Sequence, residues 1–314
     1  MATIKNFGEF NLIDRIQAIS KSVPMPKDVL CGIGDDAAVI RKNKSEVELI
    51  STDAIVSGVD FDIKKAKPDL IGRKLMAINL SDIAAMGGVP EQALLTLGVP
   101  ASTTTTWLEQ FIKGFSKLAK EYKVKLVGGD ITSSKEFWAS VTLRGKAKTN
   151  GWVSRSKAKS GDLVFVTGSL GGSLLGSHLE FTPRVKEVKK LMGVIKPSSM
   201  IDVSDGLLQD LNHILKASKV GAAIYADWVP VSQDAVKIAK STKKSPLQHA
   251  LTDGEDFELL FTVSRAQLKK VPNFLLKTHV TCVGVITKKK ELNIFRSPSN
   301  LKNVQVSKKG FVHF

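Results

Sequence analysis

Short apolar runs alternate with longer segments of helical apolar spacing along the chain. The runs predict strands at 47–51, 92–99, 125–127, 138–144, 162–167, 200–203, 257–263 and 279–286. Helical spacing predicts helices at 69–86, 102–122, 174–181, 185–192 and from Gly206 through Leu215. The first of these helices is followed by Gly87-Gly88 and Pro90, which is a helix-stop signal. Strands and helices in both halves predict an α/β (α+β) fold with mixed sheets and flanking helices.

A polar stretch from Gly145 to Lys159 separates the two series of elements. A chain of 314 residues has the length of about two domains. We therefore predict an N-terminal domain over 1–145 and a C-terminal α/β domain over 146–314.

Composition is typical of a globular protein, with 43% hydrophobic and 24% charged residues. These values exclude collagen-like and mostly disordered chains. No apolar run approaches the ~18 residues of a membrane span, and Glu9 and Asp14 interrupt any secretory signal. Cys31 and Cys282 are too few for a disulfide framework or a cysteine-rich zinc site. We expect a cytoplasmic protein without a membrane partner.

The net charge of +16 raises the question of a nucleic-acid partner. The lysines form scattered short clusters, and aromatic residues make up only 6% of the chain, which leaves few stacking platforms. We therefore expect no nucleic-acid partner and interpret the lysines as a solvated surface that also attracts small anions. Many of the acids, by contrast, lie beside glycines or in uncharged runs, which suggests metal binding.

The segment from Gly32 to Ala37 matches the dinucleotide fingerprint G-x-G-x-x-A. The fingerprint requires a crossover helix, but only residues 37–46 separate it from the next predicted strand. Asp35 and Asp36 would also face a pyrophosphate without a cation between them. We reject this interpretation, and the chain has no P-loop either.

Five acid-bearing segments could instead hold phosphates through Mg²⁺, which prefers carboxylate, water and phosphate oxygens. They are Gly34-Asp35-Asp36, Ser51-Thr52-Asp53, Asn79-Leu80-Ser81-Asp82, Gly128-Gly129-Asp130 and Asp202-Val203-Ser204-Asp205-Gly206. Three of them follow apolar strand-like runs, and open α/β sheets bind ligands at strand ends. Any one of these acids alone could be an ordinary turn or cap residue. Five such segments together favour a metal site.

Other candidates carry weaker signals. The five histidines show no metal-ligand spacing, and the loop from Gly168 to Gly172 is either a phosphate cradle or a plain turn. Arg155 is either a phosphate ligand or a surface residue of the linker. The three acids of the segment 253–256 precede an apolar strand, and that density favours function.

Nine motifs, in order and in register, resemble the thiamine-monophosphate kinase family. They are GEFNLI (8–13), GIGDDAAVI (32–40), STD (51–53), NLSDIAAMGG (79–88), GGD (128–130), SRSKAKSGD (154–162), IDVSDGLLQDLNHI (201–214), DGEDFELLFT (253–262) and the terminal GFVHF. Together they extend over essentially the whole chain. The family that the chain resembles belongs to a superfamily of ATP-using enzymes, which includes aminoimidazole ribonucleotide synthetase.

The resemblance implies two α/β domains, with metal and ATP binding and dimerisation in the N-terminal one. It implies a homodimer that transfers the γ-phosphoryl group of ATP to thiamine monophosphate with several Mg²⁺ ions. Metal ligands would be Asp36, Ser51, Thr52, Asp53, Asp82, Asp130, Asp202 and Asp205. ATP contacts would be Gly129, Asp130, Arg155 and Ser204. Metal-assisted transfer to an oxyanion requires no covalent nucleophile and no obligatory base, so we assign no catalytic residue of that kind.

The acceptor site departs from the family pattern. Glu255 would contact thiamine, but Asp60 stands where the family has a histidine that touches the substrate. Lys308 replaces an aromatic residue that stacks on the substrate, and the chain ends Phe311-Val312-His313-Phe314 instead of Tyr-x-His-Phe. Asp60 could pair with the cationic thiazolium, whereas Lys308 would disfavour it. We therefore treat Asp60, Glu255 and Lys308 as substrate-binding candidates.

Three alternatives stay open at this point. The chain could be a sibling ATP-dependent synthetase with another acceptor, although Cys31 is in the wrong setting for selenophosphate synthetase. The ending without cysteine disagrees with the hydrogenase-maturation relative. The chain could also be an ATP-binding scaffold with impaired catalysis, or a basic RNA-associated protein.

Overall fold

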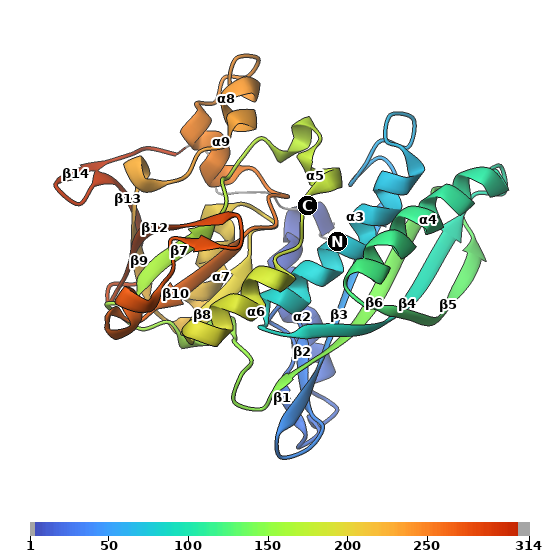
Figure 1. Ribbon diagram of the computed structural model, residues 1–314, viewed down its shortest axis with the longest axis horizontal. Helices are drawn as coiled ribbons and strands as arrows, with labels where there is room; N and C mark the ends of the chain where they lie inside the picture. Colours follow the sequence, from blue (N-terminus) through green and yellow to red (C-terminus); the bar gives the residue numbers. More distant parts are fainter. Residues whose placement is uncertain (1–3, 307–314) are drawn as a thin grey trace.

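The computed structural model describes residues 4–306 and contains two β-sheets, one in each half of the chain. Helix α3 (Pro68–Ala85) lies between the N-terminal sheet and the C-terminal half (Figure 1). It contacts strands β3 and β6 of the first sheet, and α5, α6 and β8 of the second half. The site described below forms along this helix.

The N-terminal sheet has the order β1-β2-β3-β6-β4-β5. Its strands are β1 (Val29–Cys31), β2 (Ala38–Arg41), β3 (Glu46–Val56), β4 (Val89–Val99), β5 (Lys125–Ser133) and β6 (Trp138–Lys148). All neighbours are antiparallel except β4 and β5, which are parallel. Strand β2 pairs with β3 only as far as Ile50, so residues 51–56 of β3 have a free edge on that side.

Helices α3 and α4 (Thr105–Glu121) cover one face of this sheet. The two helices pack closely at Gly114 of α4, where a Cβ would lie 1.8 Å from the carbonyl oxygen of Asp69 on α3, so only glycine fits there. The Thr104 hydroxyl caps α4 by accepting the Trp107 N–H at 3.2 Å. Most of α3 is buried, including Leu75 and Ile83, because the helix is covered on several sides. Before the sheet come α1 (Ile4–Phe7) and α2 (Glu9–Ser20), and no residue of α2 is buried.

The C-terminal sheet has the order β14-β13-β9-β12-β7-β10-β8, with β11 paired to β12. Its strands are β7 (Leu163–Thr167), β8 (Ser199–Asp202), β9 (Gly221–Tyr225), β10 (Leu259–Val263), β11 (Phe274–Leu275), β12 (Thr278–Thr287), β13 (Leu292–Ser297) and β14 (Asn300–Asn303). The helices are α5 (Ser177–Glu180), α6 (Val185–Val194), α7 (Leu207–Ser218), α8 (Gln233–Ile238) and α9 (Pro246–Thr252). A second core forms beneath α7 and α9.

The predicted fold class is confirmed: both halves contain a sheet with flanking helices. All eight predicted strands are present, although β3, β5 and β6 extend several residues beyond their apolar runs. The pattern missed α1, α2, α8, α9, β1, β2, β9, β11 and the final hairpin, which are short or only partly buried and so lack a clear period. No crossover helix follows Gly34, because the chain turns directly into β2. The domain boundary at 145/146 stays a prediction.

In the part of the chain that the structure describes, no helix has the length and apolar character to cross a membrane.

Candidate active site

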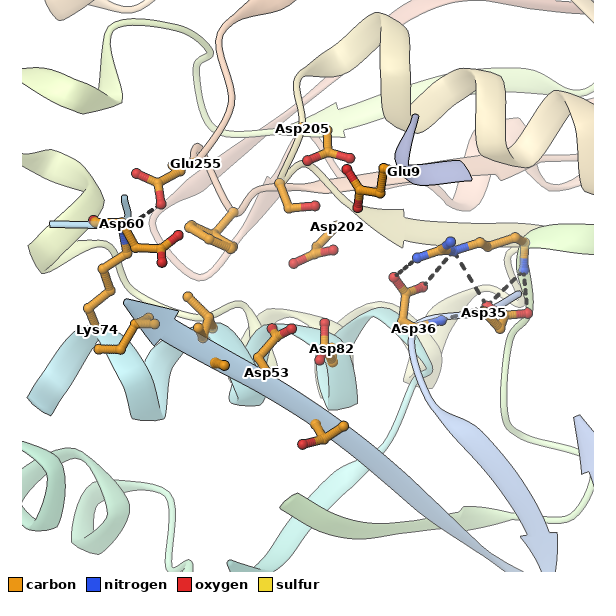
Figure 2. Close-up of a pocket in the computed structure, with 17 residues that line it drawn as sticks. Glu9, Asp35, Asp36, Asp53, Asp60, Lys74, Asp82, Asp202, Asp205 and Glu255 are labelled. Carbon is orange, nitrogen blue, oxygen red and sulfur yellow. Dashed lines mark hydrogen bonds and ion pairs between the residues drawn. The ribbon is translucent and has the colours of Figure 1, made fainter. Parts of the chain in front are cut away.

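A polar cavity of about 370 Å³ lies between the two halves of the chain. Nine carboxylates and two basic side chains line it, and Figure 2 shows them converging from several elements. Its lining residues are Glu9, Asp35, Asp36, Thr52, Asp53, Ala54, Ile55, Asp60, Lys74, Ile78, Asp82, Arg155, Asp202, Ser204, Asp205, Glu255 and Phe257.

The local structure of β3 and α3 explains how the N-terminal half supplies its side chains. Thr52 and Asp53 point to opposite faces of β3, and both line the cavity because the strand edge is free there. Lys74 and Asp82 lie about two turns apart on α3, roughly 12 Å along its axis. The helix therefore places a base at one end of the cavity and a carboxylate near its centre.

Three carboxylates from both halves meet at the centre. Ligand oxygens of Asp36, Asp82 and Asp202 all lie within 4.8 Å of one another. Burial, followed by the charges of neighbouring aspartates, raises the pKa of Asp82 well above its usual range. Burial and the charge of Asp36 raise the pKa of Asp202 to about 8, although the Ser81 hydroxyl donates to it at 2.6 Å.

These residues fit a divalent cation. Carboxylate oxygens are the ligands that Mg²⁺ prefers. Asp36 is paired with Arg155, whereas the raised pKa values of Asp82 and Asp202 indicate that the protein does not compensate their negative charges. Within residues 4–306, neither Asp82 nor Asp202 forms an ion pair with a lysine or an arginine. Ser51, on the same face of β3 as Asp53, adds a buried hydroxyl without a hydrogen-bond partner in the described chain.

Arg155 defines one end of the cavity. Its guanidinium donates to Asp36 Oδ1 at 2.6 Å, and its backbone N–H donates to Asp35 Oδ2 at 3.1 Å. Burial opposes the charge of Arg155, but the neighbouring aspartates raise its pKa. Burial and the charge of Asp36 raise the pKa of Asp35 to about 6.

Lys74 defines the other end, which is built differently. Its side chain is only 1% exposed, and its ammonium donates to the Asp60 carbonyl oxygen at 2.9 Å and to Glu255. His178 Nδ1 lies 3.1 Å from Glu255 Oε2 and 3.2 Å from Lys74 Nζ. Burial alone would raise the pKa of Glu255, but the neighbouring His178 and Lys74 outweigh it and lower that pKa.

The loop that carries Glu255 is strained and is tied to the loop after β8. Glu255 and Phe257 both have positive φ angles, of +64° and +49°. The Glu255 N–H donates to the Ser204 carbonyl at 2.7 Å, and the Phe257 N–H donates to the Val203 carbonyl at 2.7 Å. Strain held in this way is common at functional sites.

The structure brings most of the sequence-predicted residues to this one cavity. Those that line it are Asp36, Thr52, Asp53, Asp60, Asp82, Arg155, Asp202, Ser204, Asp205 and Glu255. Ser51 lies beside it in the core, and Lys308 lies outside the described residues. The Asp60 carboxylate accepts the Val56 N–H at 2.7 Å, which makes it part of its own turn as well. The roles of these residues stay predictions.

Gly129 and Asp130 are not at the cavity of this chain. Asp130 pairs with Thr96, which pairs with Ser140, which pairs with Ala54 beside Asp53. Three strand spacings place it roughly 14 Å from β3. All nine residues of β5 are exposed.

Sequence reasoning missed Glu9, Lys74 and His178 as site residues. Glu9 was noticed only inside a motif, and Lys74 lies within an apolar helical pattern that gives no sign of a buried charge. His178 has no metal-like spacing, and its role depends on contacts between the two halves. A second cluster, formed by Asp205, Asp210 and His213, was also missed; its ligand atoms lie within 4.8 Å of one another.

Comparison with known proteins places the chain in a family. Residues 34–147 match the family described as AIR synthase related protein, N-terminal domain, and residues 159–296 match its C-terminal domain. Thiamine-monophosphate kinase of Rhodopirellula baltica is 39% identical over 91% of this chain and 92% of its own length. The chain belongs to the thiamine-monophosphate kinase family.

Two further members of this family align over nearly the full length. The enzyme of Buchnera aphidicola subsp. Schizaphis graminum is 36% identical over 98% of this chain and 99% of its own. A solved structure described as "AaThiL complexed with AMPPCP and TMP" has a TM-score of 0.86 and 30% identity, and covers 100% of this chain and 99% of that one. The predicted family resemblance is therefore confirmed.

Proposed function

We propose that this protein transfers the γ-phosphoryl group of ATP to thiamine monophosphate, which yields thiamine diphosphate and ADP. The observation that carries the proposal is the cavity itself: carboxylates from both halves converge at its centre, and a basic side chain lies at each end. Family membership supports the same reaction, because the relatives are named for it and one was solved with an ATP analogue and TMP. We expect the reaction to take place in the cytoplasm.

Asp36, Asp82 and Asp202 would hold Mg²⁺ together with Thr52, Asp53 and Asp205, and Ser51 lies within the same segment of β3. Bound Mg²⁺ would neutralise the negative charge of two phosphates that must approach each other. Arg155 and Ser204 both line the cavity and would contact ATP. The acceptor monophosphate is already an oxyanion, so the chain needs to orient it rather than to remove a proton from it.

The opposite end of the cavity would receive the thiamine part of the acceptor. Glu255, Asp60 and Phe257 offer carboxylates and an aromatic ring there, which suit a cationic heteroaromatic group. Lys308 would add to this end from outside the described residues. Lys74 lies about two helix turns from Asp82, so the acceptor phosphate can reach the centre while its rings stay at this end.

Gly129 and Asp130 would complete the site from a second copy of the chain. Strand β5 is an exposed edge, and β4 and β5 carry the exposed apolar side chains Leu94, Leu126, Val127 and Ile131. A homodimer formed through this region would cover part of this apolar surface. It would also bring Asp130 of one subunit toward the cavity of its partner, which one chain alone does not do.

A coupled ADP-release assay with Mg²⁺ tests the reaction. We expect turnover with thiamine monophosphate and none with thiamine or aminoimidazole ribonucleotide precursors. Turnover only with a precursor would favour a sibling synthetase. Tight Mg·ATP binding without any turnover would favour a catalytically impaired scaffold and would contradict the proposal.

Mixing two inactive variants tests the contribution of the second subunit. Asp82→Asn and Asp130→Asn should each be inactive, but an exchanged 1:1 mixture should regain about a quarter of wild-type activity. Half of the dimers are then mixed, and one of their two sites carries neither substitution. If Asp130 acted within its own chain, both sites of a mixed dimer would carry a substitution and the mixture would stay inactive.

A further inference from the structure

His178 makes two contacts that one nitrogen atom cannot satisfy at the same time. Its Nδ1 lies 3.2 Å from Lys74 Nζ and 3.1 Å from Glu255 Oε2. An ammonium only donates hydrogen bonds and a carboxylate only accepts them, whereas an imidazole nitrogen does one or the other. The Nδ1 atom must therefore serve Lys74 or Glu255 and leave the other without a hydrogen bond.

Burial of Lys74 decides which neighbour is served. The Lys74 side chain is only 1% exposed, and its other two N–H groups have the Asp60 carbonyl and Glu255 Oε1 as acceptors. A buried N–H without an acceptor is costly, so the third one requires Nδ1 in its unprotonated form. No proton then lies between His178 Nδ1 and the Oε2 atom of Glu255, so this oxygen accepts no hydrogen bond from His178.

The two residues also differ in access to the cavity. Glu255 lines it and its side chain is 24% exposed, whereas His178 is not among the lining residues and lies behind Glu255. Arg73 fixes the position of His178, because its guanidinium donates to the Leu179 carbonyl at 3.2 Å and to the Phe181 carbonyl at 2.6 Å. His178 therefore acts on a ligand only through Glu255 and Lys74.

We propose that His178 is a positioning residue of the acceptor site: its Nδ1 accepts from Lys74 and leaves Glu255 Oε2 to a cationic, nitrogen-rich acceptor. This inference rests on the proposed function and names the part of the site that would select the thiazolium and aminopyrimidine groups. The backbone strain at Glu255 is consistent with a carboxylate whose orientation has to be imposed.

Protonation of His178 reverses the arrangement. The charged groups in contact with its ring are Lys74 of α3 and Glu255 of the strained loop, and Arg73 of α3 is bonded to the backbone carbonyls that follow it. A protonated Nδ1 donates to Glu255 and can no longer accept from Lys74. The imidazolium then occupies the carboxylate that the acceptor needs, so the acceptor binds less tightly at acid pH.

Two substitutions separate this role from a merely structural one. His178→Leu removes both contacts, and we expect it to raise KM for thiamine monophosphate about tenfold, the factor for one hydrogen bond to a charged group. His178→Asn keeps an acceptor for Lys74 in its amide oxygen, and we expect a rise of less than about threefold. In both variants kcat and KM for ATP should stay within about twofold of wild type, as they should in the exposed control Glu180→Gln.

The pH profile adds a readout that packing alone would not change. As the pH is lowered, KM of the wild type for thiamine monophosphate should rise more steeply than KM of either His178 variant, because only the wild type can protonate this imidazole. An equally steep rise in His178→Asn would overturn the proposal. The proposal would also be overturned if His178→Leu lowered kcat and raised KM for ATP as much as KM for thiamine monophosphate.

Nitrogen NMR of the histidine side chains tests the same inference without turnover. The spectrum of His178→Asn identifies the missing signal among the five histidines of the chain. In the wild type at pH 8, Nδ1 of His178 should show the shift of an unprotonated acceptor, and Nε2 should carry the proton. A proton on Nδ1 would contradict the proposal. If the wild type does not phosphorylate thiamine monophosphate at all, the proposed function fails and the tautomer result still stands separately.

Discussion

The centre of the cavity and its acceptor end hold carboxylates in opposite electrostatic states. At the centre, Asp36, Asp82 and Asp202 lie within 4.8 Å of one another, and the pKa values of Asp82 and Asp202 are raised. At the acceptor end, Glu255 is paired with Lys74, and its pKa is lowered. The protein thus neutralises the charge at this end with its own side chain, whereas Asp82 and Asp202 at the centre require a cation from solution.

The largest effect should come from removing one charge at the centre. Asp82→Asn should lower kcat/KM by roughly a hundred- to a thousandfold, because the substituted side chain is a poor ligand for a cation that holds both phosphates. Steady-state kinetics measure the loss, and the exposed Asp227→Asn serves as the control. Without metal, Asp82→Asn should be at least as stable as the wild type, since it lacks one of the repelling charges. Near-normal turnover would contradict the cation site.

The nucleotide end should respond in stability as well as activity. Arg155→Met removes the guanidinium from the buried carboxylates of Asp35 and Asp36, and we expect a loss of about 3 kcal/mol in the free energy of unfolding. Urea denaturation measures it, with the exposed Lys159→Met as a charge-matched control. Mg²⁺ should restore part of the loss, since it supplies positive charge to the same carboxylates. Equal stability of both variants would show that Arg155 is not needed to balance these acids.

A smaller effect should appear in the pH dependence of stability without metal. Asp202 and Asp35 have folded pKa values of about 8 and about 6, above the ordinary value of 3.8. The folded state therefore binds more protons than the unfolded state in this range, and stability falls as the pH rises from about 4 to about 8. Thermal unfolding in EDTA should show a decreasing Tm, and Mg²⁺ should raise Tm most at the alkaline end. A Tm that rises with pH in EDTA would contradict this account.

The smallest effect should come from the N-terminal helix. Glu9 lines the cavity, but α2, which carries it, has no buried residue. Glu9→Gln should therefore change the Mg²⁺ concentration for half-maximal activity by no more than about threefold. A change as large as that of Asp82→Asn would place Glu9 among the principal ligands.

The sequence predicted the centre of the cavity better than its ends. Asp53 and Asp202 follow runs with a clear apolar pattern; Asp202 ends β8 as predicted, whereas Asp53 lies within β3, which continues to Val56. Lys74 could not be found in this way, because apolar spacing on α3 does not reveal that a lysine is buried by the opposite half of the chain. The contact of His178 with Glu255 depends on the packing of two short segments without regular periodicity.

The position of Asp130 shows a different limit. Its motif indicates function, but its distance from Asp53 depends on the order of the strands, which the apolar pattern does not specify. The order β3-β6-β4-β5 places it on an exposed edge. Within the described chain, that edge lies three strand spacings from β3.

The central claim, that Asp36, Asp82 and Asp202 together hold a divalent cation, is tested most directly by anomalous diffraction from crystals grown with Mn²⁺ and a non-hydrolysable ATP analogue. We predict an anomalous peak within about 2.5 Å of oxygens from all three carboxylates, and its loss in Asp82→Asn. A fully occupied nucleotide with no peak between these carboxylates, or a peak that survives unchanged in the variant, would contradict the account.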